Sequence, residues 1–398
     1  MYNLLDGTRV VELGHILNGP LAGQVLGDFG ADVIKVEALS GDVYRYAGAH
    51  RNPTMGAAWA ATNRNKRSIA IDLKSTQGKA ILRQLLTGAN AMIHNLRPRA
   101  VERLGFGYQE VDAIRPGIVY CFSAGFGQNG PLADYPAIDD LIQAHAGIAS
   151  LNKAVDGTPR LVPMVVADTM SAQMLGQSVL AGLFHQQKTG EGCCIEVPMF
   201  ETVTSLMLSQ HMQGQAFEPP IGDFGYQRVL SEHRQPCKTL DGYIVHGVYR
   251  REHWITLFTA LEMTDWLQSA FLQDSASVAA HIGELYTVMA NDIIPTRTTA
   301  QWLTFFRSLD LACAPVKNFD DIRNDEHLKA VGLFREYDHP TEGLMREVRL
   351  PVNVQGINET TDLPPPNLGQ DTAQVLRELG YSDDQLVSLR DDGVITGR

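Results

Sequence analysis

Residues 8–37, TRVVELGHILNGPLAGQVLGDFGADVIKVE, decide the fold of this 398-residue chain. Residues 9–13 are a short, mostly apolar strand candidate, and residues 15–20 form a turn. Residues 21–29 then have a helical pattern that ends at Gly30, and residues 32–36 form a second apolar strand. A strand, a helix and another strand in this order predict a βαβ unit with parallel strands.

The alternation of strands and helices continues to about residue 122. Residues 68–73, 91–94 and 118–122 are strand candidates. Ser75 predicts the N-cap of a helix that ends at Gly88. Strands separated by helices predict a parallel sheet in an open α/β domain, whose ligands bind at the carboxyl ends of the strands.

Beyond residue 122 the chain predicts a long helix, then a linker, and after the linker a second, smaller domain. The longest helical pattern runs from Asp168 to Gly190, and a Pro- and Gly-rich linker is expected at residues 217–226. The other expected elements are strands at 195–197 and 243–248, helices at 254–261 and 300–309, and a final helix at 372–379.

The composition narrows the class of protein. The chain has 33 Lys+Arg and 45 Asp+Glu, a net charge of −12, which argues against non-specific binding to nucleic acid or to an anionic membrane. With 44% hydrophobic and 20% charged residues, a mostly disordered chain is excluded. Five cysteines without a CxxC pair, no signal-peptide pattern and no apolar run of about 18 residues predict a cytoplasmic protein with reduced thiols.

Residues 125–130 (GFGQNG) match the G-x-G-x-x-G pattern and follow a predicted strand. A dinucleotide site requires the third glycine to open a helix, whereas Pro131 and Pro136 follow here without helical periodicity. A flexible loop that a ligand can approach closely is therefore favoured over NAD binding. Because HExxH, paired histidine spacing and GxSxG are missing from the sequence, neither a metal site nor a hydrolase elbow is predicted.

Asp168 is the residue that stands out by its position. It follows the apolar run 162–167 and starts the longest helix, where we expect it to be the N-cap. Backbone N–H groups and the helix dipole would then favour the ionised carboxylate, which is the form that a carboxylate nucleophile needs. A purely structural cap explains the position equally well.

Seven basic residues flank the predicted third and fourth strands: Arg64, Lys66, Arg67, Lys74, Arg97, Arg99 and Arg103. Side chains at strand ends of an α/β sheet are well placed to bind phosphates or carboxylates. A solvated rim of the domain is the alternative.

Short sequence blocks occur in order along the chain. They are GHILNGP (14–20), GADVIKVE (30–37), NKRSIAIDLK (65–74), NLRP (95–98), RLGF (103–106), residues 125–131, 167–168, TGEG (189–192), TLDGY (239–243) and 315–316. Together these blocks resemble the family III CoA-transferases, the group of formyl-CoA transferase and carnitine CoA-transferase.

The resemblance implies a Rossmann-like large domain built from both chain ends, residues 1–215 and 331–398. A small central α+β domain would occupy residues 216–330. It also implies an obligate homodimer of interlocked subunits, no permanently bound cofactor, and coenzyme A thioesters as substrates.

The resemblance further implies that Asp168 is the catalytic aspartate. The residues that it assigns to the CoA site are Leu17, Asn18, Ile71, Asp72, Leu73, Lys74, Asn95, Leu96, Arg97 and Arg103. The sequence departs from the family where Leu17-Asn18 stands for the frequent Gln-Ala, and where Ala38-Leu39 lacks a basic residue after Glu37.

The chemistry expected from the resemblance is covalent. Asp168 would attack an acyl-CoA carbonyl to give a mixed anhydride, and the CoA thiolate would convert this anhydride into an aspartyl-CoA thioester. We hypothesise that N–H groups of a substrate loop stabilise the oxyanions. The residues of that loop are Gly125, Gly127, Gln128 and Gly130, with Ile138 beside it.

Two alternatives stay open. An acyl-CoA racemase of the same fold would need a histidine where this chain has Ile138, and we expect the nearby His145 to be structural. A non-catalytic acyl-CoA-binding protein would bind CoA without an adduct on Asp168. For the transferase, Arg228 and Arg234 suggest that the substrates are dicarboxylates, with succinyl-CoA as donor. An ordinary charged surface explains these two arginines equally well.

Overall fold

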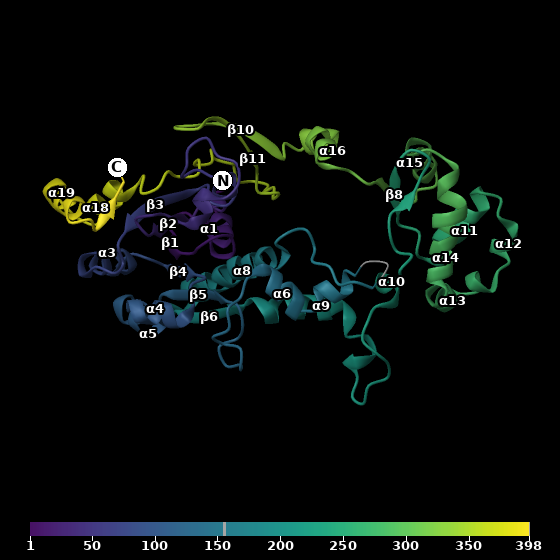
Figure 1. Ribbon diagram of the computed structural model, residues 1–398, viewed down its shortest axis with the longest axis horizontal. Coiled ribbons are helices and arrows are strands. Elements are labelled where there is room, and N and C mark those ends of the chain that lie inside the picture. The colour runs from purple at the N-terminus through teal and green to yellow at the C-terminus, as the bar shows by residue number, and fades with distance from the viewer. Residues whose placement is uncertain (154–156, 398) are drawn as a thin grey trace. The chain divides into compact units, whose positions relative to one another are not determined.

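The computed structural model describes residues 1–153 and 157–397. Residues 1–153, 158–207 and 332–397 form one compact unit, the large unit, and residues 208–331 form a second, the small unit. Both ends of the chain lie in the large unit (Figure 1). Among the described residues, none of the helices has the length and apolar character needed to cross a membrane.

A seven-stranded sheet forms the centre of the large unit, in the order β12-β3-β2-β1-β4-β5-β6. Its strands are β1 (Arg9–Leu13), β2 (Asp32–Glu37), β3 (Lys66–Ile71), β4 (Ala91–His94), β5 (Val119–Ala124), β6 (Cys193–Pro198) and β12 (Ile395–Thr396). All neighbours are parallel except β12, which pairs antiparallel with β3. The predicted parallel α/β sheet is confirmed.

The order in which successive strands are added to the sheet reverses at β1. From β1 the chain adds β2 and then β3 on one side, and afterwards β4, β5 and β6 on the other. In open α/β sheets, ligands bind at such a switch point, outside the carboxyl ends of the strands. The fold therefore directs attention to the segments that follow β1 and β4.

The helices of residues 1–211 are α1 (Asn18–Asp28), α2 (Ala57–Ala60), α3 (Thr76–Thr87), α4 (Pro98–Leu104), α5 (Tyr108–Ile114), α6 (Asp139–His145), α7 (Ile148–Leu151), α8 (Val166–Thr189) and α9 (Met199–His211), with the 3₁₀ turn η1 (Val43–Tyr46). The last part of the chain adds a hairpin of β10 (Phe334–His339) and β11 (Gly343–Val348), then α18 (Thr372–Glu378) and α19 (Asp383–Asp391).

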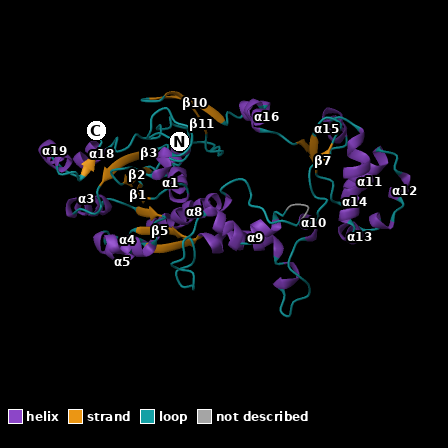
Figure 2. Ribbon diagram, viewed as in Figure 1, coloured by secondary structure: helices purple, strands orange, loops and turns teal. Residues whose placement is uncertain are grey.

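Helices cover both faces of the sheet because its strands are apolar on both sides. Val10 of β1 is buried in one cluster with Leu26 of α1 and Leu175 of α8. The next residue, Val11, is buried in another cluster with Leu82 of α3 and side chains of α18 and α19. Successive side chains of a strand point to opposite faces, so these residues hold a helix layer on each side (Figure 2).

The small unit has its own core of aromatic and aliphatic side chains, including Trp254, Phe258, Trp302 and Phe306. Its helices are α10 (Gln227–Leu230), α11 (Arg251–Ala260), α12 (Thr264–Leu267), α13 (Ser275–Ala280), α14 (Ile282–Val288), α15 (Thr299–Ser308), α16 (Phe319–Asn324) and α17 (Glu326–Ala330), and its antiparallel strands are β7 (Cys237–Lys238), β8 (Tyr243–His246) and β9 (Cys313–Pro315). Short turns complete it: η2 (Gln213–Ala216), η3 (Ala270–Leu272), η4 (Met289–Ile293) and η5 (Ile294–Thr296).

Two predictions about helices were wrong. Helix α8 starts at Val166 with Val165 as its N-cap, so Asp168 lies within the first turn and is not the cap. The helix expected at 372–379 is α18, but α19 and β12 follow it, so it is not the last element. Sequence patterns locate helix ends only to within a few residues.

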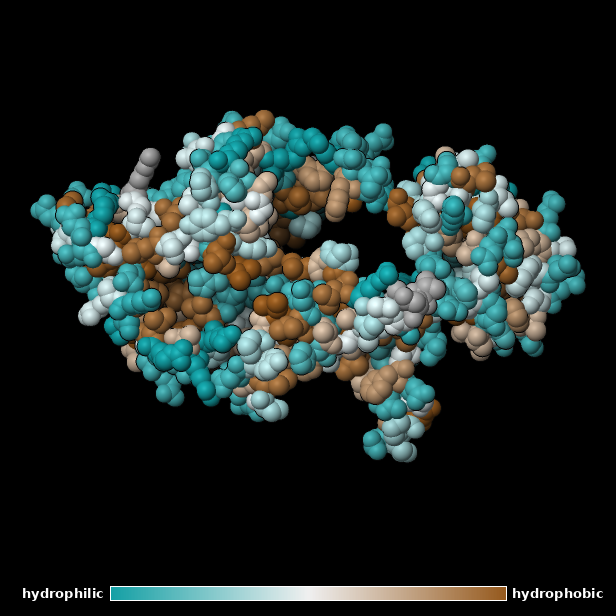
Figure 3. All heavy atoms as spheres, viewed as in Figure 1, coloured by the Kyte–Doolittle hydropathy of each residue, from teal (hydrophilic) through white to brown (hydrophobic). Residues whose placement is uncertain are grey.

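Several large hydrophobic side chains are exposed. Phe184 of α8 is 68% exposed, Ile221 is 72% exposed and Phe319 of α16 is 90% exposed. Hydrophobic residues also lie among hydrophilic ones on the face viewed in Figure 3. Exposed apolar surface of this kind is typical of proteins that associate, when it forms contiguous patches.

Candidate active site

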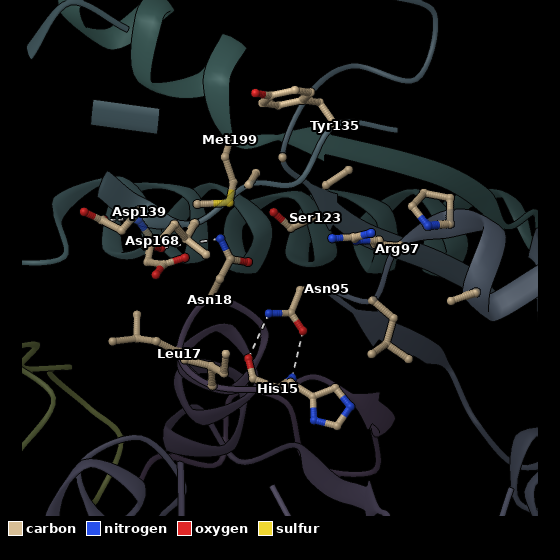
Figure 4. A pocket seen from close by; sticks show the side chains of 18 of the residues that line it. His15, Leu17, Asn18, Asn95, Arg97, Ser123, Tyr135, Asp139, Asp168 and Met199 are labelled. Carbon is tan, nitrogen blue, oxygen red and sulfur yellow. Dashed lines mark hydrogen bonds between the residues drawn. The ribbon is translucent and has the colours of Figure 1, made fainter. Parts of the chain in front are cut away.

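A cavity of about 560 Å³ lies in the large unit at the switch point of the sheet. Its walls come from the segments after β1, β4 and β5 and from the starts of α6 and α8 (Figure 4). The volume falls in the range of small-molecule and cofactor sites. Asp168 contributes to the wall of this cavity.

Asp168 is fixed through its main chain by two side chains. Its N–H donates a hydrogen bond to Oδ2 of Asp139 across 3.0 Å, and its carbonyl accepts one from Nδ2 of Asn18 across 3.5 Å. Asp139, which is buried, also accepts at Oδ1 from Nε2 of Gln143 across 2.6 Å. Within the described part of the chain, no hydrogen bond to the carboxylate oxygens of Asp168 is found, so they are open to a substrate.

Burial, together with the neighbouring carboxylate of Asp139, raises the pKa of Asp168 to about 6. We expected the helix start to lower the pKa of Asp168 and so favour the ionised form. That expectation is wrong, because desolvation and the negative charge of Asp139 raise the pKa. At neutral pH the group is still ionised, but its carboxylate is poorly solvated. A poorly solvated carboxylate at the wall of a cavity is suited to nucleophilic attack.

Six of the residues assigned to the CoA site line the cavity: Leu17, Asn18, Asn95, Leu96, Arg97 and Arg103. The other four, Ile71, Asp72, Leu73 and Lys74, lie at the end of β3 and are not part of the wall. Ile71 is fully buried and pairs with β12, so its side chain belongs to the core.

The side chain of Asn95 holds the loop between β1 and α1. Its Oδ1 accepts a hydrogen bond from the N–H of His15 across 2.7 Å, and its Nδ2 donates to the carbonyl of the same residue across 2.9 Å (Figure 4). Both ends of the carboxamide are thus used within the protein, and Asn95 shapes the wall of the cavity.

The seven basic side chains differ in their surroundings. Arg97 and Arg103 are exposed at the cavity and have no acidic partner among the described residues, whereas Arg99 pairs with Asp134 across 2.7 Å. The remaining residue after β3, Lys74, is exposed outside the cavity.

Arg64, Lys66 and Arg67 do not line this cavity, and the first two do not form a solvated rim either. Arg64 binds Asp28 across 2.6 Å and Lys66 binds Glu12 across 2.8 Å, and both lysine and arginine are buried. Arg67 pairs with Asp32 across 2.6 Å. Both interpretations were wrong for Arg64 and Lys66, because each of these buried cations is satisfied by a carboxylate of a neighbouring strand or helix.

The glycine loop only partly reaches the cavity. Gly125 and Ile138 line it, whereas Gly127, Gln128 and Gly130 do not. The N–H of Gly127 donates to Glu201 across 2.8 Å, and that of Gln128 donates to Glu196 across 2.7 Å. These two N–H groups, which we expected to stabilise an oxyanion, are already bound to carboxylates.

His145 packs in an aromatic cluster. Its ring centroid lies 5.3 Å from that of Phe126 and 5.9 Å from that of Phe200. Ile138 is 61% exposed and stands at the N-terminus of α6, directly before Asp139.

Arg228 and Arg234 lie in the small unit, where both line a cavity of about 320 Å³. The guanidinium of Arg228 lies over the rings of Tyr226 and Tyr249, 5.4 and 5.0 Å from their centroids. Within the described residues, no group of three or more metal-ligating side chains is present.

Several residues that line the cavity were not predicted from the sequence, among them Asp139, Ser123 and Met199. Asp139 had a usable signal, since Asp139-Asp140 is an acidic pair at a helix start. Ser123 and Met199 had none, because nothing in their neighbours distinguishes a strand-end serine or a helix-start methionine from a core residue.

Comparisons with known proteins agree with this geometry. The family model described as CoA-transferase family III matches residues 5–372. The chain belongs to this family. It is therefore a CoA-transferase, as the resemblance of the sequence blocks predicted.

Relatives of this family III CoA-transferase include the human succinyl-CoA:glutarate CoA-transferase, 28% identical over 98% of this chain and 90% of its own length. Succinate–glutarate CoA-transferase of Agrobacterium fabrum is 30% identical over 94% and 95% of the two chains. Formyl-CoA:oxalate CoA-transferase of Escherichia coli is 27% identical over 98% and 99%.

Solved structures share the fold of this CoA-transferase. A CAIB/BAIF family protein from Brucella suis matches 95% of this chain and 100% of its own, with a TM-score of 0.79 and 26% identity. The Mycobacterium tuberculosis protein Rv3272 matches 94% and 99%, with a TM-score of 0.81 and 26% identity.

Proposed function

We propose that this CoA-transferase moves CoA from an acyl-CoA thioester to a free carboxylic acid, with Asp168 as the covalent nucleophile. The observation that carries the proposal is the carboxylate of Asp168, which is open to the cavity and has a raised pKa. The family match supports CoA chemistry at this site.

The reaction balances without water, an external acid or a cofactor. A carboxylate oxygen of Asp168 attacks the thioester carbonyl and the C–S bond breaks. The CoA thiolate departs, and the acyl group remains on Asp168 as a mixed anhydride. The thiolate attacks the aspartyl carbonyl of the anhydride, which releases the donor carboxylate and forms an aspartyl-CoA thioester. The acceptor carboxylate then reverses both steps, and Asp168 is regenerated as a carboxylate.

Arg97 and Arg103 are the groups best placed to bind the phosphates of CoA. Both are exposed at the cavity and have no acidic partner in the described part of the chain. One guanidinium group can donate two parallel hydrogen bonds to two oxygens of the same phosphate, which provides orientation as well as affinity. Residues 71–74 would contact CoA only where the molecule extends beyond this cavity.

The substrates we propose are dicarboxylates, with succinyl-CoA as donor. Two relatives are named for succinyl-CoA or succinate and glutarate, and a third for formyl-CoA and oxalate. We propose that Arg228 and Arg234, which share a cavity of the small unit, bind a carboxylate of such a substrate there.

A panel of acceptor acids tests this function. The protein is incubated with succinyl-CoA and one acid at a time, and chromatography follows the acyl-CoA products. We expect transfer to glutarate and other dicarboxylates to exceed transfer to monocarboxylates. A wide margin in favour of monocarboxylates would contradict the dicarboxylate proposal, and no transfer to any acid would contradict the function itself.

The racemase alternative is less well supported. It requires a proton-relay histidine, and Ile138 occupies the position where the resemblance would put it, while His145 packs against Phe126 and Phe200. Exchange of the α-proton for deuterium would favour the racemase.

A non-catalytic acyl-CoA-binding protein would bind CoA but transfer nothing.

We further propose that the protein is a homodimer of interlocked subunits, as the family resemblance implies. The exposed side chains of Phe184, Ile221 and Phe319 are consistent with surfaces that a second copy covers. Light scattering during size-exclusion chromatography should give twice the mass of the 43.7 kDa chain. A monomeric mass would contradict the proposal.

A further inference from the structure

The loop between β1 and α1 forms one wall of the cavity. His15, Ile16, Leu17 and Asn18 all line it. Ile16 has a φ of +63°, in the left-handed region. A β-branched residue is strained there, and such a conformation persists only where the surrounding structure enforces it.

Asp42 provides the contact that enforces it. Both of its carboxylate oxygens accept from the N–H of Ile16, each across 3.1 Å, and Oδ1 also accepts from the N–H of Tyr44 across 3.0 Å. Asp42 is 1% exposed and is not part of the cavity wall. Asp42 therefore acts on the cavity wall through its hydrogen bonds to Ile16 and through the charge that it presents to the neighbouring His15.

Asp42 is itself fixed by a buried set of charges. Nζ of Lys35 lies 3.3 Å from Asp42 and 2.9 Å from Glu12, and it donates to the carbonyl of Gly14 across 2.6 Å. Lys66 binds the other oxygen of Glu12 across 2.8 Å. All four charged side chains are fully buried, and two cations balance two anions.

This charge set is an expensive way to stabilise a core, because each ion has lost its hydration. Burial opposes ionisation of Asp42, but Lys35 and the N–H groups of Tyr44 and Ile16 outweigh it and lower the pKa of Asp42. The carboxylate therefore stays charged at neutral pH, and its hold on Ile16 is strong.

The end of the held loop faces the nucleophile. Asn18 begins α1 and is 2% exposed, and its Nδ2 lies 3.5 Å from the carbonyl oxygen of Asp168. Its Oδ1 is buried without a hydrogen-bond partner among the described residues. A rotation of the backbone at Ile16 would move Leu17 and Asn18 relative to Asp168.

We propose that Asp42 is a positioning residue for CoA transfer, which holds Ile16 in the left-handed conformation and so fixes the Leu17–Asn18 wall opposite Asp168. This inference rests on the proposed function of Asp168. It assigns a role to a residue that touches neither the cavity nor the reacting atoms.

A double-mutant cycle tests the proposal. Glycine adopts a positive φ without strain, so Asp42 should matter little once residue 16 is replaced by glycine. We expect Asp42→Ala to lower kcat/KM by about tenfold or more in the wild-type chain, from the size of backbone strain at such residues. In the Ile16→Gly background the same substitution should cost less than about threefold.

The matched control is Ile16→Ala, which removes most of the side chain from the cavity wall but keeps the strain. Asp42→Ala should be as costly in this background as in the wild type. If Asp42 only neutralised Lys35, its loss would be equal in all three backgrounds, and that result would overturn the proposal.

Two further measurements keep the test decisive. Affinity for CoA itself, measured by calorimetry in the same variants, should follow the same background dependence. If the wild-type protein transferred no CoA, the proposed function would fail, whereas this affinity cycle would still test the hold on the loop. Should Asp42→Ala not fold, the whole cycle is run in a Lys35→Met background, where Asp42→Ala leaves no buried lysine without that partner, and equal losses with and without Ile16→Gly would again overturn the proposal.

Discussion

The main-chain N–H of Asp168 donates to the carboxylate of Asp139 across 3.0 Å, which brings two carboxyl groups together at the start of α8. The N–H of Asp168 is thus bound to another carboxylate, and a second negative charge lies beside the nucleophile. The charge of Asp139 and the burial of the site raise the pKa of Asp168 to about 6.

The first prediction concerns the dependence of activity on pH. Only ionised Asp168 can attack, so kcat/KM should fall as the pH drops through about 6. Asp139→Asn removes the neighbouring charge but keeps an oxygen that can accept from the N–H of Asp168. Its midpoint should lie at lower pH than that of the wild type, and an unchanged midpoint would contradict the role of Asp139.

The second prediction concerns stability. The pKa of Asp168 is higher in the folded state than its ordinary value of 3.8, so the folded state binds more protons, and ionisation costs stability as the pH rises from about 4 to about 6. Asp168→Asn should therefore raise the free energy of unfolding by about 1–3 kcal/mol at pH 7.5.

Urea denaturation at pH 7.5 and at pH 4 measures this effect. Little or no stabilisation is expected at pH 4, where the folded wild-type protein is protonated at this group. A variant that is destabilised at pH 7.5 would show that Asp168 contributes to the fold. The predicted gain of stability with loss of activity is typical of residues kept for function.

The third prediction concerns CoA binding. Arg97→Ala and Arg103→Ala should each raise the KM for acyl-CoA by about tenfold, because each removes a charged hydrogen-bond donor to phosphate. Arg377→Ala is the control, since Arg377 lies on α18, pairs with Asp383 of α19 and does not line the cavity. Equal effects of all three substitutions would indicate a general loss of positive charge and not a phosphate site.

The fourth prediction concerns the glycine loop. A Cβ on Gly125 would lie 2.2 Å from the Cβ of Ala137, so Gly125→Ala should destabilise the protein by about 1–3 kcal/mol. Adding Ala137→Gly makes room and should recover most of the loss in thermal unfolding. Without such recovery, close packing would not be the reason for a glycine at this position.

The parallel sheet and its strands could be predicted because the apolar runs are short and separated by clear helix signals. Residues 9–13 and 91–94 were predicted with the bounds that β1 and β4 have in the structure. The N-cap of α3 at Ser75 is confirmed by its hydrogen bond to the N–H of Gly78.

The electrostatics of the site could not be predicted in this way. The register between the strands decides whether the side chain of Lys66 faces solvent or contacts Glu12. A local sequence pattern does not contain that register. Likewise, Asp139 lies 29 residues before Asp168, and only the folded chain reveals that its charge raises the pKa of the nucleophile. The left-handed conformation of Ile16 has no sequence signal, because glycine or asparagine is the usual residue there.

Trapping the covalent intermediate tests the central claim most directly. The protein is incubated with succinyl-CoA, treated with hydroxylamine and digested, and mass spectrometry locates the hydroxamate. We expect it on Asp168, only when the thioester is present, and not in Asp168→Asn. Active CoA transfer by the wild-type protein without a hydroxamate at Asp168, or with one on another carboxyl group, would contradict the account.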